Sequence, residues 1–294
     1  MEVLLAKKRG FCSGVKRAIR IVEESLDDAQ KDERTTPLYV LNEIVHNKVV
    51  VQELKKKGVS FITQKELVNL KPQESLVFSA HGVSPSVRQT AKDAKLRIID
   101  ATCPLVDFVH KSARQHLEQG FQIVYIGHAN HDEVEGVLGE GEIHLVESIS
   151  DVDELIQSDK ISATAPVVWL SQTTLSVSDT QNIVEHLRRN LPNLVEPQSE
   201  CICRATQERQ DAARTLAKEV GEQGAIIVVG SKNSSNTQRL ADLTRSLGVD
   251  TIQIDVVTEL DLAQIKKYQR IGITSGASVP DYIVDEVLAT LLPL

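Results

Sequence analysis

Short runs of aliphatic, often β-branched residues alternate with amphipathic helical stretches along the whole chain, and this alternation restricts the fold more than any other feature. The apolar runs predict strands within residues 37–43, 75–82, 97–103, 121–129, 166–173, 225–231 and 269–276. Helical periodicity predicts helices at residues 14–28, 47–57, 84–95, 105–119, 177–190, 205–222 and 236–247. Such alternation is typical of βαβ units with parallel sheets. The sequence therefore predicts an α/β fold whose active loops lie at the carboxyl ends of strands, where helices begin.

Composition excludes several classes of protein. Of the 294 residues, 41% are hydrophobic but only 3% are aromatic, so aliphatic side chains have to fill the core. The net charge of −8 argues against broad binding to nucleic acid, which requires a basic surface. An apolar stretch of about 18 residues, which would span a membrane, is missing, and the apolar run at the start is too short for a signal peptide. We therefore expect a soluble cytoplasmic protein. A plastid-type origin would need a transit peptide, and we expect none in this sequence.

Three cysteines mark an internal repeat. Cys12, Cys103 and Cys203 each precede a predicted helix, and they lie 91 and 100 residues apart. Each cysteine is followed at similar offsets by two polar loops, which contain in chain order His46, His81, His131, Thr173, Ser234 and Ser278. We infer three similar α/β units of about 90 to 100 residues, within the usual range of domain sizes. Three such units can close around a pseudo-threefold axis, which would bring the cysteines together at the centre.

Convergent thiolates suit a metal centre better than disulfides, because cytosolic thiols stay reduced. Structural zinc sites usually contain close cysteine pairs, which Cys12 and Cys103 do not form. Iron–sulfur clusters normally have four cysteine ligands, so three would leave one iron open as a Lewis acid. Helix starts stabilise thiolates through exposed N–H groups and the helix dipole. Cys203 is nearer the third helix start than Cys201, and alternation in an extended segment would point Cys201 away. We therefore favour Cys203 as the third ligand.

The loop "GHANHDEVEG" and the strand end "SQTTLS" contain the best acid–base candidates. Glu133 is the preferred general acid, because a carboxyl group tuned by its pocket commonly supplies catalytic protons. Thr173 and Thr174 could relay a proton or cap the next helix. A solvated turn without catalytic function, and a lone zinc site involving the histidines of the loop, remain alternatives for "GHANHDEVEG".

Two serine-rich turns follow apolar strands and open helices, as anion-binding turns do. Their polar side chains are Ser234, Ser235, Asn236 and Ser278. The spacing of a Walker A motif is missing from the first of these turns. The equivalent loops of the first repeat contain His46 and His81. These residues indicate a small anionic ligand, such as a diphosphate, held largely by neutral donors.

Eight motifs together resemble the 4-hydroxy-3-methylbut-2-enyl diphosphate reductase family of the methylerythritol phosphate route to isoprenoids. They are "RGFCSGVKRAI", "EIVHNK", "FSAHGVS", "DATCPLV", "GHANHDEVEG", "SQTTLS", "GSKNSSN" and "SGASVPD". The resemblance runs in order from residue 3 to about residue 285. The sequence departs from the pattern at Arg204, Glu208 and Val279, none of which is a candidate ligand.

The resemblance implies a trefoil of three similar small α/β domains with parallel sheets around one 4Fe-4S cluster per chain. It assigns the cluster ligands to Cys12, Cys103 and Cys203, the proton donor to Glu133 and the relay to Thr173. Substrate-binding positions are His46, His81, His131, Thr174, Ser234, Ser235, Asn236 and Ser278. Domain boundaries are expected at 14–103, 104–200 and 201–294, with the strand in residues 1–13 packing on the third domain.

The implied activity is a reductive dehydroxylation that yields isopentenyl and dimethylallyl diphosphate, with two electrons from a reduced ferredoxin or flavodoxin type of donor. Two other functions remain open from the residues. One is a non-redox iron–sulfur hydratase or dehydratase that uses the same open iron. The other is an iron–sulfur RNA-binding sensor, against which the acidic balance and the lack of an aromatic RNA-binding strip count.

Overall fold

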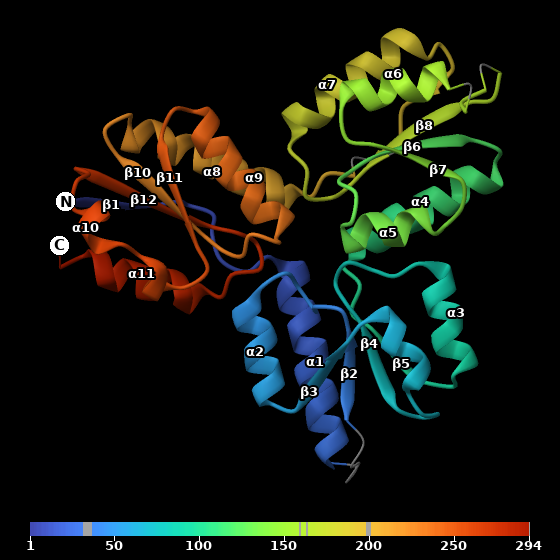
Figure 1. Ribbon diagram of the computed structural model, residues 1–294, viewed down its shortest axis with the longest axis horizontal. Coiled ribbons are helices and arrows are strands. Elements are labelled where there is room, and N and C mark those ends of the chain that lie inside the picture. Colours follow the sequence, from blue (N-terminus) through green and yellow to red (C-terminus); the bar gives the residue numbers. More distant parts are fainter. Residues whose placement is uncertain (32–36, 159, 163, 198–200, 294) are drawn as a thin grey trace. The chain divides into compact units, whose positions relative to one another are not determined.

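The computed structural model describes residues 1–31, 37–158, 160–162, 164–197 and 201–293 (Figure 1). The described residues form three four-stranded sheets in which all strand pairs are parallel. The prediction of an α/β fold with three parallel sheets is therefore confirmed.

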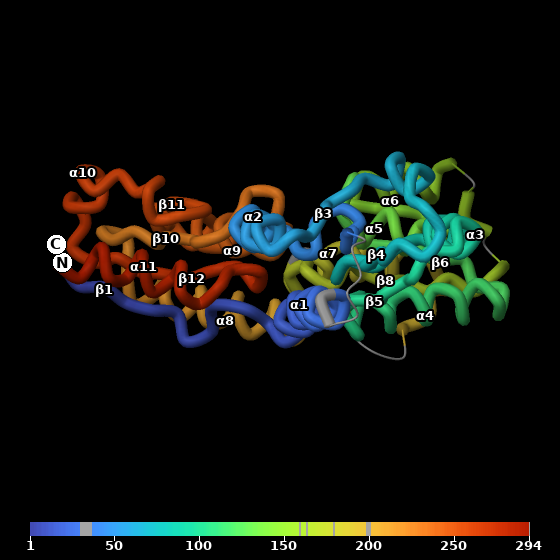
Figure 2. The backbone as a smooth tube through the Cα atoms, turned by 90° about the horizontal axis from the view of Figure 1, so that it is seen from below, coloured from blue at the N-terminus to red at the C-terminus, as the bar shows by residue number. Residues whose placement is uncertain are grey.

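The strands of each sheet are close together in the sequence, with one exception: the N-terminal strand belongs to the C-terminal sheet. The first has the order β3-β2-β4-β5, with β2 (Leu38–Leu41), β3 (Val59–Ile62), β4 (Ser75–Phe78) and β5 (Arg97–Asp100). The second has the order β7-β6-β8-β9, with β6 (Gln122–Ile126), β7 (Ile143–Val146), β8 (Val167–Ser171) and β9 (Leu194–Val195). The third has the order β1-β12-β10-β11, with β1 (Glu2–Leu5), β10 (Ala225–Val229), β11 (Asp250–Ile254) and β12 (Arg270–Ser275). The N-terminal strand thus belongs to the C-terminal sheet, where β1 and β12 run side by side (Figures 1 and 2).

Helices connect the strands. They are α1 (Ser13–Lys31), α2 (Lys48–Lys56), α3 (Pro85–Asp93), α4 (Pro104–Glu118), α5 (Asp132–Leu138), α6 (Ile149–Gln157), α7 (Val177–Asn190), α8 (Arg204–Val220), α9 (Ser235–Ser246), α10 (Leu262–Ile265) and α11 (Asp281–Leu291). Two 3₁₀ helices lie at Gln64–Asn69 and Val257–Glu259. The sequence periodicity missed α5, α6, α10 and α11; of these, α5 and α10, with 7 and 4 residues, are too short to show it.

Contacts divide the chain into two compact units. One comprises Met1–Lys16, Val45–Lys57 and Arg204–Leu294 and contains the sheet of β1, β10, β11 and β12. The other comprises Arg17–Ile44 and Gly58–Cys203 and contains both other sheets. The domain boundaries expected from the sequence stay a prediction, and their position at residue 200 lies outside the described residues.

The C-terminal sheet shows why its strands read as continuous apolar runs. In β10, Ala225, Ile227 and Val229 pack towards α11, whereas Ile226 and Val228 pack towards α8 and α9. Figure 1 shows these helices on opposite faces of the sheet. Because successive strand residues point to opposite faces, a strand covered on both sides is apolar at every position.

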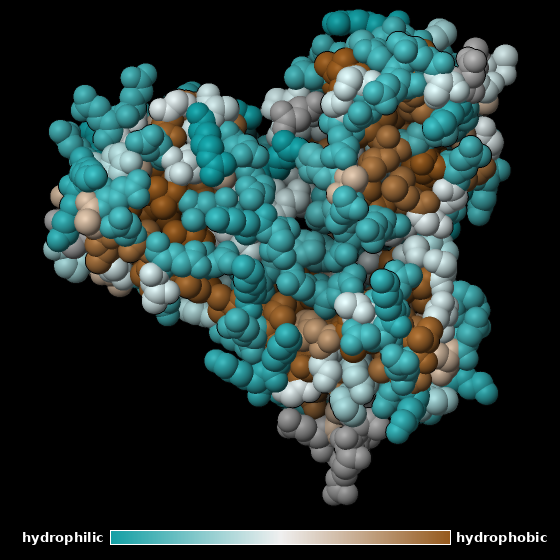
Figure 3. Space-filling view, in the orientation of Figure 1, coloured by the Kyte–Doolittle hydropathy of each residue, from teal (hydrophilic) through white to brown (hydrophobic). Residues whose placement is uncertain are grey.

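The surface is mostly polar on the face shown in Figure 3, where hydrophilic side chains cover the outer sides of the helices. Within the described residues, none of the helices combines the length and the apolar character that a membrane crossing requires.

Candidate functional site

Cys12 lies in a tightly bonded loop of the unit that contains the C-terminal sheet. It immediately precedes α1, and its Sγ accepts a hydrogen bond from the N–H of Val15 at 3.4 Å. Its own N–H donates to the carbonyl of Ala277, at 3.0 Å, in the loop that also contains Ser278. The thiol is half-buried. The loop therefore presents Cys12 at a helix start, as the sequence predicted, and anchors it to the end of β12.

Arg209 holds the same loop from α8. Gly10 has a φ of +72°, a conformation that glycine adopts readily, and its N–H donates to Ser275 Oγ at 2.7 Å. The buried guanidinium of Arg209 donates to the carbonyl of Gly10 at 2.6 Å and to that of Ala205 at 2.8 Å. Sequence reasoning missed Arg209, because its partner is 199 residues away along the chain.

An Arg209→Met variant is expected to lower the free energy of unfolding by about 3 kcal/mol, since it removes two hydrogen bonds from a charged donor and leaves a buried carbonyl without its partner. Urea denaturation of the cluster-free chain measures this value. The control is Arg204→Met on the same helix, whose exposed ion pair with Glu208 is worth no more than about 1 kcal/mol. Equal losses for the two variants would contradict the role given to Arg209.

The two serine-rich turns and the His46 loop meet within the same unit. Asn236 Oδ1 accepts from the N–H of Ala277 at 2.9 Å, and its Nδ2 donates to Thr206 Oγ1 at 3.3 Å. Ser278 Oγ donates to the carbonyl of His46 at 3.0 Å. Ser234 is the N-cap of α9, and its Oγ accepts from the N–H of Thr237 at 3.4 Å. The structure therefore brings together the anion-binding candidates that lie in this unit, and Ser235 is the first residue of α9.

Two glycines let these turns pack closely against the start of α9. A Cβ atom at Gly230 would lie 2.6 Å from Thr237 Oγ1, and one at Gly276 would lie 2.1 Å from the same atom. No larger residue fits at either position without moving Thr237, whose side chain is fully buried. The ends of β10 and β12 are thus held against the N-terminus of α9, where backbone N–H groups favour an anion.

Cys103 and Cys203 lie in the other unit, each beside a polar strand-end loop. Cys103 is the N-cap of α4, and its N–H donates at 3.0 Å to the carbonyl of Ala80, the neighbour of His81. The N–H of Cys203 donates at 2.9 Å to the carbonyl of Thr173. Both thiols are half-buried. All four cysteines lie in described parts of the chain as thiols, none in a disulfide.

Glu133 and Thr173 form a buried pair in this unit. Glu133, in the first turn of α5, is only 2% exposed. Its Oε1 accepts from the backbone N–H of Thr173 at 2.8 Å, and its Oε2 accepts from Thr173 Oγ1 at 3.0 Å. Because Thr173 also accepts from the N–H of Cys203, the acid candidate, its relay and one ligand candidate form a single hydrogen-bonded chain. The structure thus brings together three residues that the sequence placed 30 to 70 residues apart.

A buried tyrosine lies close to this pair. Tyr125 lies in β6 and is fully buried. Burial, followed by the negative charge of Glu133, raises the pKa of Tyr125 well above its usual value. The phenol therefore stays protonated near neutral pH.

His81 and His131 approach each other near Glu133. Their rings form an edge-to-face contact with centroids 5.7 Å apart. His131 is the N-cap of α5, and its Nδ1 accepts from the N–H of Glu133 at 3.1 Å. Asp132 Oδ2 lies 3.7 Å from His81 Nδ1, and its Oδ1 accepts from Asn42 Nδ2 at 3.1 Å. The sequence did not single out Asp132 as a site residue, because its partners come from distant loops.

Thr174 lies next to the pair on the strand-end loop. Its Oγ1 accepts from Gln172 Nε2 at 3.1 Å, while Gln172 Oε1 accepts from the N–H of His128 at 3.1 Å. Gln172 therefore connects the loop of His128 to the loop of Thr174 by hydrogen bonds. Sequence reasoning did not single out this glutamine.

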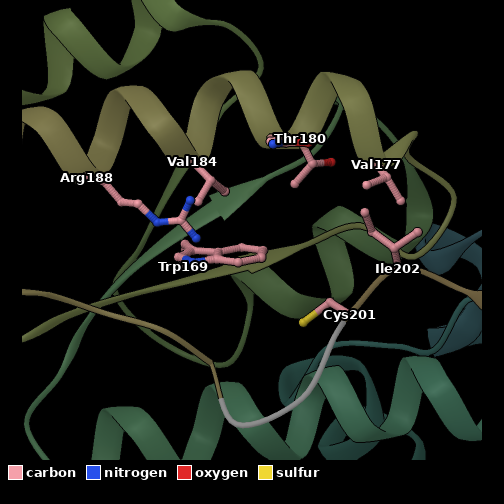
Figure 4. A pocket seen from close by; sticks show the side chains of 8 residues that line it. Trp169, Val177, Thr180, Val184, Arg188, Cys201 and Ile202 are labelled. Atoms are coloured by element: carbon pink, nitrogen blue, oxygen red, sulfur yellow. The ribbon is translucent and has the colours of Figure 1, made fainter.

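Cys201 has different surroundings from the other cysteines. It is 1% exposed and lines an apolar cavity of about 220 Å³ with Trp169, Val184 and Ile202 (Figure 4). Burial raises the pKa of the Cys201 thiol to about 11, so it remains a neutral thiol. These surroundings suit a small core residue and disfavour a metal ligand.

The three other cysteines fit an iron–sulfur cluster by the chemistry of their donors. Each thiol is half-buried, lies at the start of a helix and has its backbone N–H fixed to a strand-end loop. Thiolates are the usual protein ligands of such clusters, and helix starts stabilise their negative charge.

Comparison with known proteins gives consistent matches. Residues 3–292 match the family model described as LytB protein. A 4-hydroxy-3-methylbut-2-enyl diphosphate reductase of Stenotrophomonas maltophilia (strain K279a) is 44% identical over 301 residues, which cover 100% of this chain and 91% of the relative. The enzyme of the same name from Xanthomonas euvesicatoria pv. vesicatoria (strain 85-10) is 46% identical over 303 residues, with 100% and 90% coverage.

Two solved structures are also similar. The E-1-hydroxy-2-methyl-but-2-enyl-4-diphosphate reductase from Plasmodium falciparum has a TM-score of 0.91 and 36% identity, and the match covers 99% of this chain and 87% of that one. A second structure, of (E)-4-hydroxy-3-methyl-but-2-enyl diphosphate reductase, described as the terminal enzyme of the non-mevalonate pathway, has a TM-score of 0.68 and 32% identity, and the match covers 100% of both chains.

Proposed function

Because the chain belongs to the LytB protein family, we propose that it converts 4-hydroxy-3-methylbut-2-enyl diphosphate into isopentenyl and dimethylallyl diphosphate by reductive dehydroxylation. The observation that carries this proposal is the buried Glu133–Thr173 pair, which is hydrogen-bonded to the backbone of Cys203. Loss of a hydroxyl group as water requires a proton donor. The Glu133–Thr173 pair can supply this proton from a buried, fixed position.

Cys12, Cys103 and Cys203 would hold one 4Fe-4S cluster per chain. When bound, such a cluster supplies electrons one at a time and a Lewis-acidic iron that lacks a protein thiolate. The protein residues supply the proton, the binding of the diphosphate and the exclusion of water.

Glu133 delivers the proton that lets the substrate hydroxyl leave as water. Thr173 donates two hydrogen bonds to the carboxylate, which fix its orientation and stabilise it after the proton has left. The Thr173 hydroxyl can pass a proton to Glu133 Oε2 at 3.0 Å, which makes it the relay. The buried setting prevents competing protonation by bulk water.

The diphosphate is held by hydroxyl, amide and imidazole groups and by the N-terminus of α9. We assign this binding to His46, His81, His131, Thr174, Ser234, Ser235, Asn236 and Ser278. Anchoring the diphosphate leaves the other end of the small substrate oriented for reaction. Two electrons per turnover come from a reduced ferredoxin or flavodoxin type of protein.

The function is tested by anaerobic reconstitution followed by iron and sulfide counts and by a turnover assay. A chemically reduced dye provides electrons, and the products are separated and quantified. We expect consumption of 4-hydroxy-3-methylbut-2-enyl diphosphate that depends on the dye and gives both isopentenyl and dimethylallyl diphosphate. Cluster-loaded protein that is inert towards this substrate would exclude the proposal, and turnover without a reductant would instead indicate a hydratase or dehydratase.

A Thr173→Val variant is expected to lower kcat roughly 10- to 100-fold, because it removes one hydrogen bond to a charged group, worth about 1.5–3 kcal/mol, and keeps the backbone donor. Thr173→Ser retains the hydroxyl and should recover most of the rate. Steady-state kinetics under anaerobic conditions compare the two variants at equal iron content. If the valine variant were as fast as the serine variant, Thr173 would not be the relay.

A further inference from the structure

A buried histidine outside the proposed catalytic residues connects the segments that carry them. His110 lies in the middle of α4, the helix that begins after Cys103, and it is 5% exposed. Its Nε2 is buried and has no hydrogen-bond partner among the described residues. The sequence gives this histidine no function, and neither the proton donor pair nor the diphosphate loops include it.

Two glycines surround the His110 ring. A Cβ atom at Gly82 would lie 2.8 Å from His110 Nε2. A Cβ atom at Gly136 would lie 3.2 Å from His110 Cε1 and 3.3 Å from Nε2. Gly82 directly follows His81, and Gly136 lies one helical turn after Glu133 in α5. The ring therefore packs directly on the backbone of both segments.

Gly136 is informative because its backbone does not need glycine. Gly82 has a φ of +77°, which favours glycine by itself, whereas Gly136 lies inside α5 and is not among the residues with positive φ. Glycine in a helix interior is unfavourable compared with alanine. The close approach of His110 gives a physical reason for its presence.

The opposite side of the ring is fixed by a buried carboxylate. His110 Nδ1 donates to Glu140 Oε1 at 2.6 Å, and Arg114 Nη1 donates to the same oxygen at 2.7 Å. The Glu140 side chain is 2% exposed and follows the end of α5. His110 thus contacts α5 at its middle through Gly136 and just beyond its end through Glu140. Helix α5 cannot shift along α4 without breaking one of these contacts.

We propose that His110 is a positioning residue, which sets the place of the Glu133 carboxyl and of the His81 loop relative to the helix that begins at Cys103. The proposal rests on the proposed function for the roles of Glu133 and His81, but the packing of α5 does not depend on it. His110 itself does not touch the reacting groups. It acts through the backbones of Gly82 and Gly136, at which a Cβ atom would approach the ring to 2.8 and 3.2 Å.

The test is a double-mutant cycle of His110→Ala and Gly136→Ala with two measurements. Each single variant is expected to lower kcat on the order of 10- to 100-fold at unchanged iron content, as small displacements of catalytic groups do. In the His110→Ala background the added methyl group of Gly136→Ala finds space, so its further effect on kcat should be less than about twofold. The control is His116→Ala, another histidine of α4, which bonds to Ser112 of its own helix and should keep wild-type kcat.

The second measurement is amide hydrogen exchange of the cluster-free chain, which needs no activity. We expect faster exchange in residues 79–84 and 132–140 of His110→Ala, unchanged exchange in α6, and unchanged exchange of both segments in His116→Ala. The positioning role is overturned if Gly136→Ala costs the same in both backgrounds, or if exchange rises equally throughout the unit. If the wild-type protein failed to turn over the substrate, the proposed function would fall, while hydrogen exchange would still decide whether His110 holds α5. Glu140→Gln, which keeps the side-chain shape, is the second variant if His110→Ala does not fold.

Discussion

A Glu133→Gln variant is expected to bind the substrate but to turn it over roughly 10²- to 10⁴-fold more slowly than the wild-type enzyme, the range over which a positioned general acid contributes. Glutamine has nearly the same shape as glutamate and can still accept a hydrogen bond from Thr173. It has no acidic proton to donate, so the departing hydroxyl group loses its proton source. The loss is therefore expected in kcat, with little change in substrate affinity.

The matched control is Glu135→Gln, which makes the same chemical change two residues further along α5, at an exposed position. Both variants need equal iron and sulfide content before their rates are compared. Anaerobic single-turnover experiments separate the chemical step from product release. A Glu133→Gln enzyme that matched the Glu135→Gln control would remove Glu133 from its assigned role.

Single substitutions of Cys203 and of Cys201 distinguish a proposed metal ligand from a residue of the apolar core. Cys203→Ser is expected to lose most of its iron and to lower turnover by at least about 100-fold, since even residues that only support metal ligands commonly contribute 10- to 100-fold to metal affinity. Cys201→Ala should keep its iron and its rate. Removing its buried sulfur from the apolar core is expected to lower the free energy of unfolding by about 1 kcal/mol.

Iron and sulfide counts together with the visible absorption of the cluster measure the first effect, and urea denaturation measures the second. The two cysteines are only two residues apart, so a local disturbance of the chain would affect both variants. A difference in iron content between them therefore reports the role of the individual side chain. Full cluster content in Cys203→Ser, or loss of iron in Cys201→Ala, would mean that the two residues have the opposite roles.

The sequence was most informative about strands in the interior of the sheets. All of the predicted runs correspond to observed strands, and β2, β4, β6, β8, β10 and β12 each have a neighbour on both sides. The remaining predicted run corresponds to the edge strand β5, whereas the other edge strands, β1, β3, β7, β9 and β11, were not marked by an apolar run of their own. The residues of these edge strands are mostly half-buried or exposed, so polar and apolar types mix in them. Their strand state depends on the neighbour with which they pair, which a local pattern does not contain.

The site could be predicted only where one residue type has few alternative uses. Thiols at helix starts and a glutamate after a strand-end histidine stand out in the sequence. Arg209, Asp132 and His110 did not stand out, because each acts on a segment at least 26 residues away along the chain. A buried arginine or histidine on a helix face looks the same in a sequence whether it supports a site or only fills the core.

The N-terminal strand has a consequence for how the protein is made. Glu2 pairs with Arg270, so β1 finds its place only after almost the entire chain has been synthesised. The carbonyl of Ala277, which accepts the N–H of Cys12, is made equally late. At about 5–20 residues per second this delay amounts to tens of seconds on the ribosome. The first of the proposed ligands in the sequence is therefore the last to gain its native surroundings, so assembly of the proposed cluster would follow the completion of translation.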